Sequence, residues 1–193
     1  MRRQTKLLIP ALAILVTAGA AMAGAAVTAS GAAATQPERF TGNLVDTLAT
    51  ARSSQPFILS VDHVTDVAEI QRLNGVLTGQ GLYHLRDELW KQDAGYLSVG
   101  GGLGYPVAAV LSQETPNGRL LRVVLNRPEW IREVQSYARS SKYPFTVLEL
   151  KLDQNGKGDG LVIGAAKLQL QGDDLQIKSL GTIPLRLLDV HEG

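Results

Sequence analysis

The sequence contains no cysteine. This absence excludes disulfide bonds, a thiol nucleophile, cysteine-ligated metal sites and a lipid attached to an N-terminal cysteine. A domain without covalent cross-links must be stabilised by its own apolar core. Hydrophobic residues make up 45% of the chain and charged residues 19%, which is a globular balance and not the composition of a disordered protein.

The chain also lacks a surplus of charge of either sign, with 19 Lys and Arg residues against 18 Asp and Glu residues. Three of the basic residues, Arg2, Arg3 and Lys6, lie in the first six positions, so the remainder is slightly acidic. A protein that binds nucleic acid or an anionic membrane surface usually carries a basic excess. We therefore expect neither partner.

The N-terminal residues have the pattern of a secretory signal peptide. A basic start is followed by an uncharged apolar run that ends in the small-residue motif Ala21-Met22-Ala23. Residues 1–23 are predicted to be a cleaved signal peptide, which makes the protein exported, to the periplasm or the medium. A retained N-terminal anchor, for which the uncharged run to Val27 is about long enough, stays open. No other membrane association is expected.

Residues 24–38 contain almost no bulky side chain and are predicted to form a flexible tether rich in Ala, Gly and Thr. Residues 39–193 are predicted to form a single domain. In this domain, alternation of apolar residues predicts a strand over Phe57–Val64, with His63 in register with the apolar face. A helix capped at Asp66 and a second short helix, with Leu82, Leu85, Leu89 and Trp90 on its apolar side, are expected to follow as a hairpin.

From Gly95 onward the sequence indicates β-structure. Turn sequences at Thr115–Gly118 and Asp153–Gly160 separate apolar segments. Between them a buried face is expected for Thr146, Leu148, Leu150 and Leu152, and a wet face for Val147, Glu149 and Lys151. On that wet face Glu149 is expected to form a cross-strand charge pair. We expect an α+β domain, with a mainly antiparallel sheet of about five to seven strands covered on one face by the helical hairpin.

The glycine-rich stretch Ser98–Pro106, SVGGGLGYP, resembles a phosphate-binding loop at first sight. It lacks the third glycine of the dinucleotide motif and the Lys-Ser or Lys-Thr of a P-loop, and a strand follows it, not a helix. The glycines are predicted to shape a loop between strands. Because a glycine loop also lets a ligand or partner approach the backbone, it is a candidate contact site, formed by Gly100, Gly101, Gly102 and Tyr105.

A second candidate contact lies at Arg127 and Trp130. Exposed aromatic residues beside arginines suit a protein or carbohydrate contact. The alternative, which we favour, is that Trp130 closes the end of the sheet.

Motifs for catalysis and metal binding are missing. The nucleophile elbow, the Ser-x-x-Lys pair and the His-Glu-x-x-His zinc motif do not occur. His84 and Glu88 share a helix face, but that face is expected to be solvated. His191, near the end of the sequence, is expected in a fraying segment. Asp153–Gly158 resembles the start of a calcium loop, yet Lys157 occupies a ligand position and an Asn-Gly turn explains it. No catalytic residue, metal ligand or cofactor is assigned.

The segment from Tyr143 to Gly160, together with Arg127-Pro128 and Ile183–Val190, resembles a group of uncharacterised bacterial secreted proteins that carry signal peptides. The resemblance covers roughly residues 95–190. It implies export and a sheet-rich single domain. It implies no activity.

These observations predict an exported, non-catalytic module that binds a protein partner or a small ligand, and an enzyme is the less favoured reading. The alternative function is a metal- or carboxylate-dependent hydrolase of the cell envelope or medium, whose residues would meet only in the folded chain.

Overall fold

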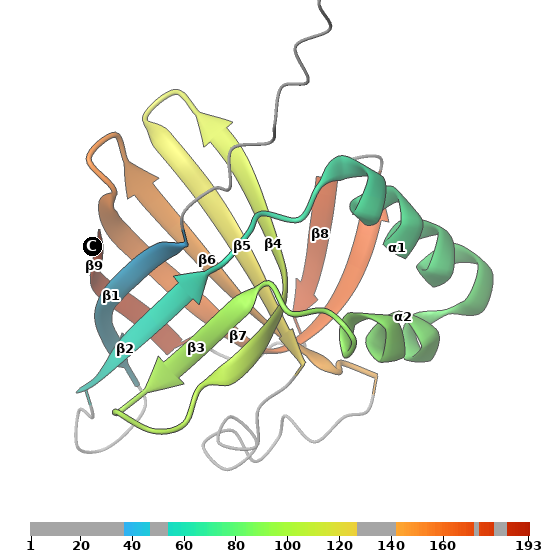
Figure 1. Cartoon of the computed structure of the whole chain (residues 1–193), viewed down its shortest axis with the longest axis horizontal. Helices are drawn as coiled ribbons and strands as arrows, with labels where there is room; N and C mark the ends of the chain where they lie inside the picture. Colours follow the sequence, from blue (N-terminus) through green and yellow to red (C-terminus); the bar gives the residue numbers. More distant parts are fainter. Residues whose placement is uncertain (1–36, 47–53, 127–141, 172–173, 180–184) are drawn as a thin grey trace, which may run out of the picture. The chain divides into compact units, whose positions relative to one another are not determined.

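The computed structural model describes residues 37–46, 54–126, 142–171, 174–179 and 185–193 (Figure 1). All of them belong to one compact unit, Ala34–Gly193. In this part of the chain no helix is long and apolar enough to cross a membrane. The elements follow the order β1 (Glu38–Val45), β2 (Ser54–Val61), α1 (Val67–Gln80), α2 (Leu82–Leu89), β3 (Gly95–Val99), β4 (Tyr105–Thr115), β5 (Gly118–Asn126), β6 (Phe145–Asp153), β7 (Lys157–Gln171), β8 (Asp174–Ser179) and β9 (Leu185–Glu192).

The strands form one antiparallel sheet in the order β6-β5-β4-β3-β2-β1-β9-β7-β8, and an additional pairing joins β6 to β7. This pairing closes eight strands into a barrel and leaves β8 as an extra strand on β7 (Figure 1). The expected α+β sheet covered by a helical hairpin is therefore wrong. The fold is mostly β, and only two short helices are found among the described residues.

Apolar side chains from all eight barrel strands fill the barrel interior. The largest of these fully buried side chains are Phe40, Phe57, Leu59, Leu97, Leu121, Leu125, Leu148 and Leu150. A barrel of eight strands is just wide enough for side chains to fill it. Apolar burial at this scale supplies the core that a chain without disulfides needs.

Two of the hairpin turns agree with the sequence analysis. Thr115 pairs with Gly118 across a two-residue turn, and Gly118 has a φ of 142° that favours glycine. Between β6 and β7 the Asp153 carboxylate accepts hydrogen bonds from the backbone N–H groups of Asn155 (2.8 Å) and Lys157 (2.9 Å). Asp153 thus stabilises a turn of the kind that Asp and Asn favour.

Close approach of the β6 and β7 backbones allows the ring to close. A Cβ atom at Gly158 would overlap the carbonyl oxygen of Lys151, and one at Gly160 would overlap the carbonyl oxygen of Glu149. Any larger residue at either position would force the two strands apart. Glycine is therefore needed at these positions because a side chain would collide with the neighbouring strand, and not because the chain turns there.

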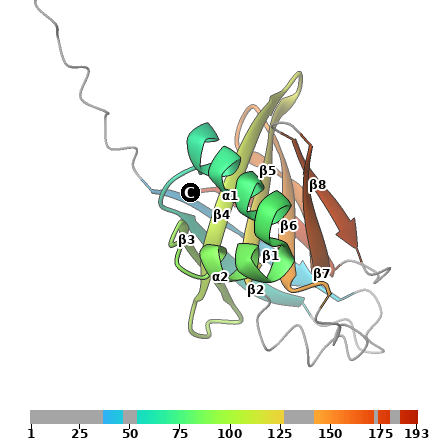
Figure 2. The ribbon, with the colours of Figure 1, turned by 90° about the vertical axis from the view of Figure 1, so that its right-hand side faces the viewer.

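The two helices pack on the outside of the barrel wall (Figure 2). The Asp66 side chain accepts a hydrogen bond from the Glu69 N–H (2.7 Å), so the predicted helix cap is confirmed. Leu73, Leu85 and Leu89 are buried against a second apolar cluster on β4, β5, β6 and β7, and the strand residues of this cluster are Ala108, Ala109, Val124, Phe145, Val147, Ala166 and Leu168.

This second cluster explains where the expected alternation fails. Val147 was expected on a wet face, yet it is fully buried, as is its neighbour Leu148 in the barrel interior. The first half of β6 is thus covered on both sides.

Three further expectations need correction. The strand predicted to reach Val64 ends at Val61, so His63 is exposed and does not extend the apolar face. Trp90, placed on the apolar side of the second helix, is exposed. His191 was expected in a fraying end but lies in β9, where its Nε2 is 2.9 Å from Thr41 Oγ1.

We expect Gly158→Ala to destabilise the barrel by about 2 kcal/mol, because the added methyl group must displace the backbone of β6. Gly75 in α1 has nothing within 4 Å of an added Cβ, so Gly75→Ala is the matched control and should stabilise the chain by about 0.5–1 kcal/mol. Equilibrium denaturation of both variants measures the two effects. Equal stability of Gly158→Ala and the unaltered chain would contradict the role assigned to this glycine.

Candidate functional site

The glycine-rich stretch forms the loop between β3 and β4, as its sequence predicted. Gly100 and Gly101 have φ values of 64° and 75°, which side-chain-bearing residues rarely adopt. No helix begins at this loop, so it lacks the helix N-terminus that a nucleotide phosphate would require.

Hydrogen bonds fix the shape of this loop. The Gly100 N–H donates to the carbonyl oxygen of Pro56 in β2 (2.8 Å), and the Gly102 N–H donates to that of Val99 (3.1 Å). The Ser98 hydroxyl donates to the carbonyl oxygen of Gly102 (2.8 Å). The loop is thus held both to itself and to a neighbouring barrel strand.

The loop displays an apolar side chain that the sequence analysis did not single out. Leu103 is 93% exposed, and nearby Tyr96 on β3 is 43% exposed. A Cβ atom at Gly104 would lie 3.0 Å from Tyr96 Cδ2, so the glycine leaves room for the tyrosine ring. The available signal was a single leucine between glycines, in a loop too short to form a core.

The other predicted contact residues are placed differently. Tyr105 is partly buried and packs against the barrel interior. Arg127 and Trp130 lie outside the described residues, so the second candidate contact stays a prediction.

Of the three histidines, His63 lines a pocket. The pocket has a volume of about 240 Å³ and lies at the start of α1, where Asp66, Glu69 and Gln92 also line it. Within the described part of the chain, no hydrogen bond to His63 is found. The acids of this pocket are engaged elsewhere, since Asp66 caps α1 and Glu69 accepts hydrogen bonds from Arg72 and Gln92.

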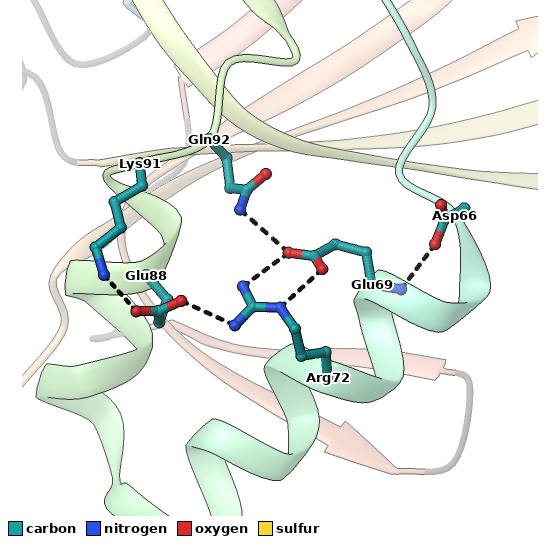
Figure 3. A network of polar contacts seen from close by, with 6 residues as sticks. All are labelled: Asp66, Glu69, Arg72, Glu88, Lys91 and Gln92. Atoms are coloured by element: carbon teal, nitrogen blue, oxygen red, sulfur yellow. Dashed lines mark hydrogen bonds and ion pairs between the residues drawn. The ribbon is translucent and has the colours of Figure 1, made fainter.

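A polar network joins α1 to α2 (Figure 3). Arg72 donates to Glu69 (2.8 Å) and to Glu88 (2.8 Å), and Lys91 donates to Glu88 (2.6 Å). The hydrogen bond from Lys91, followed by that from Arg72, lowers the pKa of Glu88. Bonding to Glu69 and Glu88 raises the pKa of Arg72.

This network occupies the carboxylate of the candidate metal pair His84 and Glu88. The Glu88 carboxylate is bonded to Arg72 and Lys91. His84 Nδ1 lies 3.0 Å from the carbonyl oxygen of Gln80, the last residue of α1. Among the described residues, no group of three or more His, Asp or Glu residues could hold a metal ion. The pair is part of a solvated helix surface.

The supposed calcium loop at Asp153 is a hairpin turn. Hydrogen bonds from the backbone N–H groups of Lys157 and Asn155 lower the pKa of Asp153, so this carboxylate serves the turn. Glu149 pairs across the sheet with Arg122 (3.0 Å), which confirms the cross-strand charge pair expected for it.

Comparison with known proteins gives no relative: no protein-family model matches the chain, and no curated protein or solved structure matches it significantly.

Replacement of Lys91 by Met should raise the pKa of Glu88 toward its ordinary value, because the largest cause of its lowering is removed. NMR titration of the Glu88 carboxyl carbon measures this. Since the folded-state pKa is lowered, the network stabilises the hairpin above the ordinary glutamate pKa and is lost as pH falls through the lowered value. Lys178→Met, at an exposed lysine of β8, is the control and should leave the titration unchanged. An unchanged Glu88 pKa in Lys91→Met would contradict the network.

Proposed function

We propose that the chain is an exported, non-catalytic binding module, and that its β3–β4 loop inserts Leu103 into an apolar recess of a partner protein. The observation that carries this proposal is the 93% exposure of Leu103 at a loop of fixed shape. Export is supported by the N-terminal pattern of basic, apolar and small residues.

The loop suits recognition because it is ordered before binding. Its hydrogen bonds to Pro56 and Val99, and that of Ser98 to Gly102, already restrict the backbone. A loop held in its bound conformation loses less entropy on association than a flexible one. Burial of a leucine side chain contributes about 1.5–3 kcal/mol, which is then available for affinity.

Tyr96 extends the same surface. Its ring lies against Gly104 of the loop and remains 43% exposed. Tyrosine is enriched at protein interfaces because it combines a large apolar area with a hydrogen-bonding hydroxyl. Leu103 and Tyr96 together would form an apolar anchor beside a polar contact.

The alternative, a hydrolase, would use His63 as a base with a carboxylate to orient it. The acids of the His63 pocket instead bond to a backbone N–H, to Arg72 and to Gln92. These bonds favour the binding module over the hydrolase.

A photoreactive amino acid at position 103 should cross-link the partner in living cells, because the Leu103 side chain would be buried in the complex. The same amino acid at position 67 is the control, since Val67 is also exposed (58%) but lies on α1. Mass spectrometry identifies the cross-linked species. Cross-linking of the same proteins from both positions, or of none from position 103, would contradict the proposal.

With the identified partner, Leu103→Ser should weaken binding at least tenfold, which corresponds to about 1.4 kcal/mol, whereas Val67→Ser should not. Isothermal titration calorimetry with the purified partner measures both.

A further inference from the structure

A second surface, independent of the glycine loop, lies on the outer wall of the barrel across β5, β6, β7 and β9. It is a groove of about 650 Å³, a volume typical of small-molecule sites. We name it the wall groove, and its lining includes Leu120, Lys151, Asp159, Leu161 and Arg186.

The register of the strands shows that these residues share the outer side. Leu120 pairs with Lys151, and Lys151 pairs with Asp159. In the next row, Leu161 pairs with Arg186. Their chain neighbours Leu121, Leu150, Val162 and Leu187 belong to the barrel interior, and successive side chains of a strand point to opposite faces.

Several charges of the wall groove already have partners. Arg119 lies 3.0 Å from Glu38, in an ion pair at one end of the barrel. Glu149 is paired with Arg122 (3.0 Å), and the Asp153 carboxylate accepts hydrogen bonds from backbone N–H groups.

Three cations of the wall groove remain without an ion pair in the described part of the chain: Lys151, Lys157 and Arg186. Two lining carboxylates oppose them: Asp159, and Asp153, which keeps its negative charge because its hydrogen-bond donors are neutral backbone N–H groups. With three cations against two carboxylates, the wall groove keeps an excess of one positive charge.

Two leucines give the wall groove apolar surface. Leu120 on β5 and Leu161 on β7 are both partly buried, and the register places Lys151 and Glu149 of β6 between them. Partly exposed leucines beside cations that lack an ion pair suit a ligand that has an apolar part and a negative charge. Arginine binds carboxylate and phosphate groups through paired N–H donors.

We propose that the wall groove binds an amphiphilic anion, with a short apolar body against Leu120 and Leu161 and one carboxylate or phosphate group held by Arg186 and Lys151. Asp153 and Asp159 then disfavour ligands with a second anionic group. Carboxylate and phosphate share this chemistry, and the experiment below distinguishes them.

The test titrates the full chain with octanoate and with octyl phosphate, using calorimetry for Kd and NMR shifts of groove amides for location. Arg186→Gln should weaken binding of both probes about tenfold, as expected for loss of a charge-assisted hydrogen bond. Leu161→Ser should weaken binding about fivefold through loss of apolar contact. Tighter binding of one probe identifies its headgroup as the preferred one, and either preference supports the proposal.

Arg39→Gln is the matched control, since Arg39 is an exposed arginine on β1 that does not line the wall groove. It should leave both affinities unchanged. Octanol tests the apolar part alone, and acetate and inorganic phosphate test the charge alone. All three should bind at least tenfold more weakly than the amphiphiles, about 1.4 kcal/mol.

The proposal is overturned if neither amphiphile shifts the groove amides, if octanol binds as tightly as octanoate, or if Arg186→Gln binds like the unaltered chain. Leu103→Ser should retain full affinity for both probes. Loss of amphiphile binding in Leu103→Ser would place the ligand at the glycine loop and overturn the proposal for the wall groove. If Leu103 binds no partner protein, the proposed function fails but the result for the wall groove is unaffected.

Discussion

The pairing of β6 with β7 is the constraint on which the rest of the structure depends. Without it the eight strands would form an open sheet with exposed backbone edges, and the side chains of the interior core would face water. The pairing is possible because Gly158 and Gly160 let two backbones approach where any side chain would collide. Two glycines thus take a structural role that small exported domains often give to disulfides.

Strand β7 connects the parts of the molecule that this closure creates. Its first half pairs with β6 and β9 and lines the wall groove, and its second half pairs with β8 and carries Leu168 into the cluster beneath the helices. The glycine loop lies on β3 and β4, away from this strand in the sheet order. The barrel therefore presents two chemically different surfaces on one hydrogen-bonded framework: an apolar tip at Leu103 and a cationic groove at Arg186.

Local features were predictable from the sequence because nearby residues determine them. The helix cap at Asp66 and the turn at Asp153 depend on hydrogen bonds within a few positions, and the loop at Gly100 on the backbone freedom of glycine. The β6–β7 pairing is itself a hairpin between consecutive strands, but a complete ring also needs β1 to pair with β9, as Phe40 does with Glu192, and periodicity does not reveal such long-range pairing. The first half of β6 is buried on both sides because the helices cover its outer face, which the sequence of the strand alone does not show. The exposure of Leu103 was not predicted because a single exposed residue produces no periodic pattern in the sequence.

The position of β9 in the sheet has a consequence for the order of assembly. β9 lies between β1 and β7, so the first barrel strand obtains its second neighbour only after residues 185–192 have left the ribosome. Contacts across such a long sequence separation make folding slow. The nascent polypeptide therefore cannot close the ring until its synthesis is almost complete, and the sheet keeps open edges until then.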